Sequence, residues 1–213
     1  MSEEIVVVVS GGEPPDPRAA SVAPIGVPVV AADKGLEHAL SLGLEVTLAV
    51  GDFDSVSPEA LAVAESSGVR IERYPEAKDA TDLELALDAA AAMDPQRILV
   101  LAGDGGRLDH QLSALLLLAS EGYAGAEVDA FVGSAWIHVV RGSRRLQGDP
   151  GALLSILPVG RAEGVTTEGL AFPLQGETLD AGTSRGVSNV FESDTARIVV
   201  ERGVLLAVRP EGP

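Results

Sequence analysis

Residues 5–132 alternate short apolar runs with segments whose leucines and alanines recur at helical spacing. The apolar runs are rich in β-branched residues, as is typical of strands buried on both faces of a sheet. Alternation of this kind predicts a mostly parallel sheet flanked by helices. We therefore expect an α/β domain over residues 1–134. Its strands are expected at Ile5–Val9, Pro28–Ala32, Val46–Val50, Val69–Tyr74, Arg97–Ala102 and Glu127–Val132.

The pattern changes near Gly133, and no convincing helical segment follows. Short apolar runs are instead separated by glycine, proline and charged turns, as in β-sandwiches and barrels. We expect a smaller all-β sandwich domain over residues 135–213. Its strands are expected at Trp136–Val140, Ala152–Leu157, Val187–Phe191, Arg197–Val200 and Val204–Val208.

The composition excludes several classes of partner and site. The 213 residues carry a formal net charge of −17, which argues against nucleic acid or an anionic membrane surface as the main partner. The absence of cysteine excludes disulfides and thiolate metal sites. No apolar stretch approaches the length of about 20 residues that spans a bilayer. No cationic segment precedes an apolar one near the N-terminus, so we expect a cytoplasmic protein.

Two carboxylates follow the third expected strand, in the stretch Gly51-Asp52-Phe53-Asp54-Ser55. If the backbone remains extended there, Asp52 and Asp54 point to the same side. Two such charges roughly 4 Å apart repel by about 4 kcal/mol at an effective dielectric constant near 20. The pair therefore favours a bound divalent cation, with a solvated polar turn as the alternative.

Further polar side chains follow other strands of the expected sheet. The carboxyl ends of parallel strands lie along one edge, where ligands bind, so these side chains are expected to line one groove. The alternative for most of the acids is helix capping or a favourable place in a first helical turn. Such a concentration of acids favours Mg²⁺, which binds through one or two carboxylates together with substrate phosphates. The residues in question are Asp33, Asp79, Asp82, Arg107 and Asp109.

Two smaller features accompany this group. Thr81 and Glu84 form a capping-box pattern at the start of an alanine-rich helix. Lys78 stands beside Asp79, and it either pairs with that acid or meets a phosphate. The chain contains neither a Walker motif nor a dinucleotide-binding glycine fingerprint after its first strand, so a nucleotide would bind here by another route.

Taken together, these motifs resemble those of the thiamin pyrophosphokinases in order and spacing. The resemblance covers nearly the whole chain. In the first half it rests on Ala32-Asp33, Gly51-Asp52-Phe53-Asp54-Ser55, Lys78-Asp79-Ala80-Thr81-Asp82 and Gly105-Gly106-Arg107-Leu108-Asp109-His110. In the second half it rests on Leu157-Pro158-Val159-Gly160, Thr167–Leu174 and Gly182–Asn189. One departure is Lys34, which stands after Ala-Asp where the family usually has glycine.

The resemblance implies an ATP-dependent transferase. The reaction is thiamin plus ATP giving thiamin diphosphate plus AMP, with Mg²⁺, in a homodimer whose active site is shared between subunits. It implies a catalytic group of Asp52, Asp54, Asp79, Asp82, Arg107 and Asp109, of which Asp52, Asp54, Asp82 and Asp79 are the metal candidates. ATP contacts are implied for Asp33, Lys78, Thr81 and Arg107. Thiamin contacts are implied for Phe172, Ser188 and Asn189, with Phe172 as the stacking ring, unless it is a core aromatic.

Two other functions compete with this one. A catalytically inactive module of the same fold would sense thiamin or a nucleotide, because folds persist without their chemistry. A metal-dependent phosphohydrolase would also use an Asp-x-Asp pair. Such enzymes place the pair after the first strand of the sheet, whereas Asp52 and Asp54 follow the third.

Overall fold

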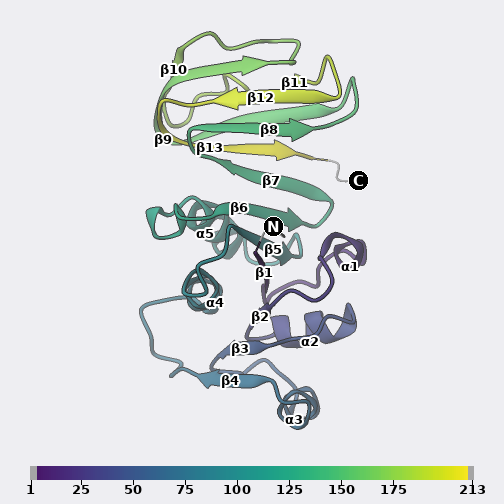
Figure 1. Ribbon diagram of the computed structural model, residues 1–213. Helices are drawn as coiled ribbons and strands as arrows, with labels where there is room; N and C mark the ends of the chain where they lie inside the picture. The colour runs from purple at the N-terminus through teal and green to yellow at the C-terminus, as the bar shows by residue number, and fades with distance from the viewer. Residues whose placement is uncertain (1–3, 211–213) are drawn as a thin grey trace. The chain divides into compact units, whose positions relative to one another are not determined.

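The computed structural model describes residues 4–210 of the chain (Figure 1). The chain divides into two compact units, the first ending at Gly133 and the second beginning at Ser134. Residues 1 and 213, the outer bounds expected for the two domains, lie outside the described residues. The α/β class of the first unit and the β-rich character of the second confirm the fold predicted from the sequence.

The first unit is built on a parallel sheet with the strand order β4-β3-β2-β1-β5-β6. Because β1 lies between β2 and β5, the chain extends the sheet in one direction and then returns to extend it in the other. The carboxyl ends of neighbouring strands therefore share one edge. The strands are β1 (Ile5–Val9), β2 (Val29–Ala32), β3 (Leu48–Gly51), β4 (Arg70–Arg73), β5 (Arg97–Ala102) and β6 (Glu127–Val132).

Helices flank this sheet on both faces, with α4 and α5 on one side and α1, α2 and α3 on the other (Figure 1). The short helix α1 lies in a proline-rich segment between β1 and β2. The helices are α1 (Ala19–Val22), α2 (Gly35–Ser41), α3 (Pro58–Ser66), α4 (Asp82–Ala91) and α5 (Leu108–Leu118), followed by the 3₁₀ turn η1 (Glu121–Tyr123).

Small residues let the helices approach the sheet closely. Ala31 of β2 and Ala49 of β3 share a buried cluster with Leu36 of α2 and Ala64 of α3. At the start of α2, a Cβ on Gly35 would lie 2.1 Å from the carbonyl oxygen of Val9. Only glycine permits this approach, so α2 begins directly against the end of β1.

The second unit consists of antiparallel strands in the order β7-β13-β9-β12-β8, with β10 and β11 paired to β9. The sequence pattern identified β7, β9, β11, β12 and β13 but missed β8 and β10, and it predicted only the first part of β9. The strands are β7 (Ala135–Val140), β8 (Ser143–Gln147), β9 (Leu153–Glu168), β10 (Glu177–Leu179), β11 (Asn189–Val190), β12 (Thr195–Val199) and β13 (Arg202–Arg209).

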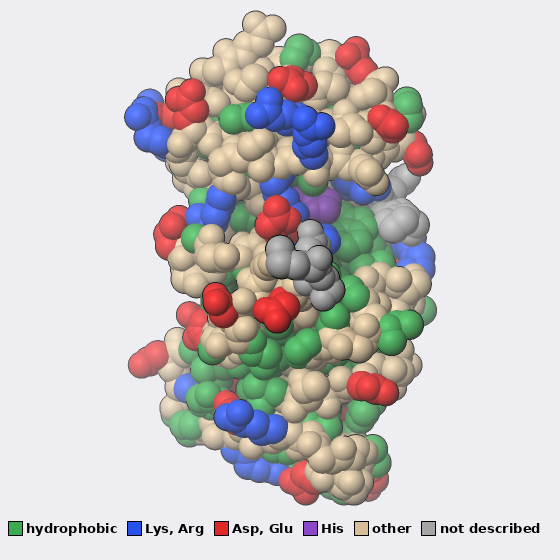
Figure 2. All heavy atoms as spheres, in the orientation of Figure 1, with side chains coloured by type: hydrophobic (Ala, Val, Ile, Leu, Met, Phe, Trp, Pro, Cys, Tyr) green, Lys and Arg blue, Asp and Glu red, His purple; other side chains and the backbone are tan. Residues whose placement is uncertain are grey.

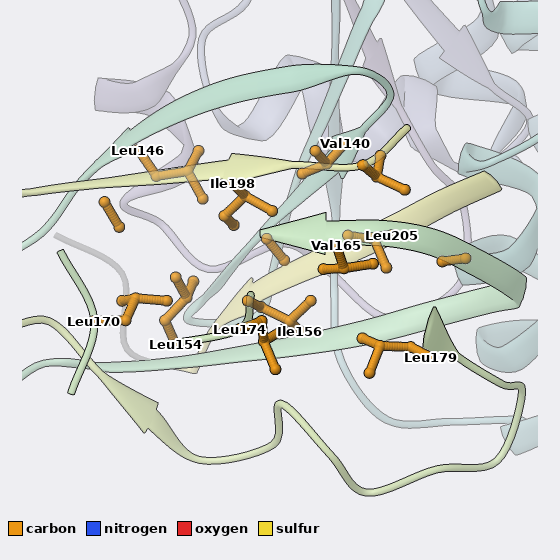
Figure 3. Close-up of a cluster of buried hydrophobic side chains, with 14 of the residues drawn as sticks. Val140, Leu146, Leu154, Ile156, Val165, Leu170, Leu174, Leu179, Ile198 and Leu205 are labelled. Atoms are coloured by element: carbon orange, nitrogen blue, oxygen red, sulfur yellow. The ribbon is translucent and has the colours of Figure 1, made fainter. Parts of the chain in front are cut away.

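Strand β9 belongs to two sheets. Its first part pairs with β13 and its last residues pair with β12. The pairing with β13 shifts register near Gly160, whose φ is +86°, and such a bulge bends a strand. Side chains from both sheets, among them Ile156, Ile198 and Leu205, meet in one buried cluster (Figure 3).

Side chains at the surface of the molecule include many acids. On the face shown in Figure 2, the acidic side chains stand in small separate groups among basic and neutral ones. Trp136 is half-buried and stacks on His138 with 5.6 Å between ring centroids. Within residues 4–210, no helix has both the length and the apolar character needed to cross a membrane.

Candidate active site

Three aspartates converge at the carboxyl edge of the parallel sheet. Asp33 follows β2, Asp52 follows β3 and Asp82 is the first residue of α4. Each offers a carboxylate oxygen, and these oxygens lie within 4.8 Å of one another. All three side chains are half-buried. We call Asp33, Asp52 and Asp82 the carboxylate triad.

Backbone geometry brings Asp33 and Asp52 together. Gly51 ends β3 with a φ of +149°, and a Cβ there would lie 3.1 Å from the Cα of Asp33. The missing side chain lets the end of β3 pass close to Asp33. Asp33 itself has a φ of +46°, a conformation that aspartate tolerates better than most residues.

Helix capping places the third member of the triad. Thr81 is the N-cap of α4, and its Oγ1 accepts a hydrogen bond of 3.2 Å from the backbone N–H of Glu84. The threonine half of the capping box predicted from the sequence is thus formed. It fixes Asp82 in the first turn of α4, where the helix dipole favours a negative charge.

Lys78 lies against two members of the triad. Its Nζ is 3.1 Å from Oδ2 of Asp52 and 2.7 Å from Oδ1 of Asp82. Only 12% of the lysine side chain is exposed. The hydrogen bond from Lys78 lowers the pKa of Asp52. Burial opposes the charge on Lys78, but hydrogen bonds to Asp82 and Asp52 outweigh burial and raise the pKa of the lysine. Lys78 therefore pairs with Asp52 and Asp82 rather than with its neighbour Asp79.

The donor set of the triad fits a hard divalent cation. Oδ2 of Asp33 accepts a hydrogen bond from Ser55, whereas its Oδ1 is buried without a hydrogen-bond partner. A buried carboxylate oxygen with no partner is costly unless something binds it. Oxygen ligands of this kind are those that Mg²⁺ takes in proteins.

Asp54 and Asp79 lie outside the triad. The backbone does not stay extended between Asp52 and Asp54, because Phe53 turns it with a φ of +59°. Phe53 is held there by burial beside Ala31 and Leu36. Asp54 is exposed, but the negative charge of Asp52 still raises its pKa. Asp79 is likewise exposed.

Arg107 and Asp109 form an exposed pair at the start of α5. The Nη2 of Arg107 lies 2.6 Å from Oδ2 of Asp109, and its Nε lies 3.2 Å from Oδ1. The hydrogen bonds from Arg107 lower the pKa of Asp109 to about 2. Asp109 does not cap the helix, because Arg107 occupies the N-cap position.

The second unit contains an open pocket with a volume of about 440 Å³. It brings together Phe172, Ser188 and Asn189, the three residues implied for thiamin contacts. The loop from Thr183 to Val187 forms the rest of its wall. Gly186 in that loop packs on β9, where the backbone N–H of Ile156 donates to its carbonyl oxygen at 2.9 Å.

The ring and the amide at this pocket have different environments. Phe172 is 59% exposed, so it is not a core aromatic. Asn189 is 2% exposed, and its side chain binds the backbone of Phe172 twice. Its Oδ1 accepts from the Phe172 N–H at 3.0 Å, and its Nδ2 donates to the Phe172 carbonyl oxygen at 2.7 Å. Oδ1 also accepts from the Val190 N–H. Asn189 therefore positions Phe172.

Some features that shape the candidate site were not identified from the sequence. Ser55 was part of a recognised motif, but its hydrogen bond to Asp33 depends on the turn at Phe53. Lys34, the departure from the family pattern, has a φ of −57° in an ordinary helical conformation. No glycine is required at that position, because the left-handed residue is Asp33 and the close approach is made by Gly35.

These features define a two-unit protein with a carboxylate triad at the edge of the sheet in an α/β unit and an open pocket in a β-rich unit. Residues 27–128 match the family model described as thiamin pyrophosphokinase, catalytic domain. Residues 137–205 match the one described as thiamin pyrophosphokinase, vitamin B1 binding domain. The chain belongs to the thiamin pyrophosphokinase family, as its motifs predict, and so to the transferases that use ATP.

Individual relatives agree with this assignment. A thiamine pyrophosphokinase from Bacillus subtilis is 26% identical over 192 residues, covering 84% of this chain and 86% of the relative. A crystal structure of thiamine pyrophosphokinase from Bacillus subtilis has a TM-score of 0.83 at 23% identity, with 98% and 99% of the two chains covered. One from Geobacillus thermodenitrificans has a TM-score of 0.80 at 25% identity, with 96% of each chain covered.

Proposed function

We propose that this chain transfers a diphosphate group from ATP to the hydroxyl group of thiamin, giving thiamin diphosphate and AMP. The observation that carries the proposal is the carboxylate triad at the edge of the α/β sheet. Oδ1 of Asp33 is buried there without a hydrogen-bond partner, and a bound cation would satisfy it. Both family matches support it, because one covers each unit.

Asp33, Asp52 and Asp82 are the residues that would hold Mg²⁺. Asp54 and Asp79, the other metal candidates, are exposed and lie outside the triad, so we assign them no direct metal contact. When bound, Mg²⁺ neutralises phosphate charge and orients the diphosphate for transfer.

The chain's own residues orient the reactants. The thiamin hydroxyl oxygen forms a bond to the β-phosphorus of ATP, and the bond from that phosphorus to the oxygen bridging to the α-phosphate breaks. AMP departs with that oxygen, and the hydroxyl proton passes to a carboxylate at the strand edge. Such transfer depends on positioning and charge neutralisation more than on covalent help from the protein.

Two cationic side chains near the carboxyl edge of the sheet are assigned to binding the phosphates of ATP. We assign Lys78 to ATP, since its ammonium already lies beside Asp52 and Asp82. We assign Arg107 to a phosphate as well, because a guanidinium binds phosphate oxygens with two donors, and Asp109 holds that guanidinium in place. Thr81 acts by capping α4 and so placing Asp82.

Thiamin would bind in the pocket of the β-rich unit. The exposed ring of Phe172 offers a flat apolar face for an aromatic ring, and Ser188 offers a hydroxyl group. The side chain of Asn189 is buried and hydrogen-bonds to backbone groups of Phe172 and Val190, so we assign it to holding Phe172 rather than to meeting thiamin directly.

We further propose a cytoplasmic homodimer whose active site is shared between subunits. Exposed leucines on α5 support the association, because a second copy would cover them: Leu108, Leu112 and Leu116. Mixing an Asp52→Ala variant with a Phe172→Ala variant would restore part of the activity if each site takes one residue from each subunit. Mixtures that form heterodimers without recovering activity would place the site within one subunit.

The test of the function is incubation of the protein with thiamin, ATP and Mg²⁺, followed by detection of AMP and thiamin diphosphate. We expect both products in equal amounts, and neither product with Asp52→Ala. Binding of thiamin without AMP formation would favour the sensor function. Release of inorganic phosphate in the absence of thiamin would favour the phosphohydrolase function.

A further inference from the structure

One wall of the pocket carries a cation. Among the described residues that line it, Arg185 alone bears a formal charge. Thiamin itself carries a positive charge on its thiazolium ring, and like charges at close range repel. A bare guanidinium would therefore weaken binding of the ligand that the pocket is proposed to take.

Glu177 meets this guanidinium in a bidentate pair. Nε of Arg185 donates to Oε2 of Glu177 at 3.0 Å, and Nη2 donates to Oε1 at 2.8 Å. Paired donors of this kind give a guanidinium–carboxylate contact both strength and a fixed orientation. Hydrogen bonding to Arg185 lowers the pKa of Glu177, so the carboxylate remains charged at neutral pH.

The pair is anchored at both ends. Glu177 begins β10, which pairs with β9 and buries Leu179 in the core of the unit. On the loop side, the backbone N–H of Arg185 donates to Oγ1 of Thr183 at 3.1 Å. Glu177 does not itself line the pocket, so its carboxylate holds the guanidinium from outside the pocket.

Arg185 also contacts the segment that carries the aromatic ring. Its Nη2 lies 3.4 Å from the carbonyl oxygen of Pro173, the residue after Phe172. Asn189 holds the backbone of Phe172 itself. The two walls of the pocket are thus joined by polar contacts at two successive residues.

We propose that the Glu177–Arg185 pair sets the charge selectivity of the thiamin pocket: Arg185 ties the pocket walls together, and Glu177 cancels its charge so that a cationic ring can enter. This inference rests on the proposed function, because it takes thiamin as the ligand of the pocket. Both members are positioning residues, since neither needs to touch the reacting atoms.

The experiment measures direct binding of two ligands to the full chain by calorimetry without ATP. One ligand is thiamin, and the other is 4-amino-5-hydroxymethyl-2-methylpyrimidine, which has the same aminopyrimidine ring without the thiazolium charge. Glu177→Gln is expected to weaken thiamin binding about fivefold, the upper range for a partly exposed charge interaction, and to leave binding of the neutral ligand within about twofold.

The double variant Glu177→Gln/Arg185→Gln removes both charges and is expected to recover thiamin affinity relative to Glu177→Gln alone, but to stay below the wild-type affinity because the contact of Arg185 with Pro173 is lost. Glu163→Gln is the matched control. Glu163 pairs with Arg161 and Arg202 in the same unit but does not line the pocket. It should leave the affinity for both ligands unchanged.

Two results would overturn the inference while leaving the function intact. One is unchanged thiamin affinity in Glu177→Gln. The other is equal weakening of both ligands, which would mean that the pair serves structure alone. A wild-type protein that binds no thiamin would instead refute the proposed function, and the inference with it.

Discussion

The Nζ of Lys78 lies 2.7 Å from Oδ1 of Asp82, and the same ammonium reaches Asp52 at 3.1 Å. One side chain thus links two members of the carboxylate triad that come from different elements. Because the lysine is largely buried, this contact is less weakened by solvent than a surface ion pair.

Lys78→Met keeps the length of the side chain and removes its charge. In a chelator, we expect the variant to be less stable than the wild type by about 1–3 kcal/mol, because two carboxylates lose their counter-charge. Added Mg²⁺ should raise its melting temperature more than it raises that of the wild type. Calorimetric melting with and without Mg²⁺ measures both effects, with Lys34→Met as the control. An equal rise in the two proteins would contradict the role assigned to Lys78.

Asp82→Asn and Asp79→Asn separate the triad from its exposed neighbour. Asp82→Asn should lower AMP formation by about 100-fold or more, because the carboxylate triad loses one of its charged oxygen donors. Asp79→Asn should remain within a few-fold of wild type, since Asp79 lies outside the triad. Titration with Mn²⁺, followed by electron paramagnetic resonance, reports metal binding independently of turnover. Loss of Mn²⁺ binding in Asp79→Asn but not in Asp82→Asn would reverse the assignment.

Phe172→Ala removes an exposed ring. We expect the KM for thiamin to rise by about tenfold, as an aromatic stacking contact of about 1–1.5 kcal/mol is lost. Stability should change by less than about 0.5 kcal/mol. The matched control is Leu174→Ala two residues away, which is fully buried and should cost about 2–5 kcal/mol in stability. A strongly destabilised Phe172→Ala protein would show that the ring supports the fold.

Asp109 should titrate far below an ordinary aspartate. Its pKa is about 2 because Arg107 donates to its charged form, so the pair's contribution to folding is complete above the unfolded pKa of about 3.9. That contribution is lost as the pH falls through about 2. Carbon-13 NMR of the Asp109 carboxyl group in wild type and in Arg107→Gln measures this directly. The midpoint should move toward about 4 in the variant, and an unchanged midpoint would refute the pairing in solution.

The periodicity of the sequence was sufficient to predict the α/β unit. Continuous β-branched runs marked its strands, and Thr81 caps a helix where the pattern predicted a helix start. The β-rich unit was harder to predict. Strand β8, Ser143–Gln147, is largely exposed and carries two arginines, so it has no apolar run to reveal it.

The site shows a similar limit. The order of the motifs in the sequence correctly predicted that Asp52 and Asp82 lie at one edge of the sheet. It also grouped Asp54 with Asp52, because strand alternation was assumed to continue past Gly51, whereas the structure brings Asp33 beside Asp52. A left-handed Phe53 breaks that alternation, and it does so because its ring is buried beside helix α2. Tertiary packing decided the conformation, and no local pattern records it.

Strand β9 also determines how the β-rich unit comes apart. A single continuous strand supplies hydrogen-bond partners to β13, β12, β10 and β11. If β9 separated from either sheet, backbone hydrogen-bonding groups of both sheets would be exposed. The two sheets are therefore expected to unfold together rather than one at a time. In hydrogen-exchange measurements, the slowest-exchanging amides of the two sheets should therefore have the same free energy of opening. The walls of the pocket are paired with this same strand, at Ile156 and Leu154. We therefore expect these walls to resist local opening as strongly as β9 does.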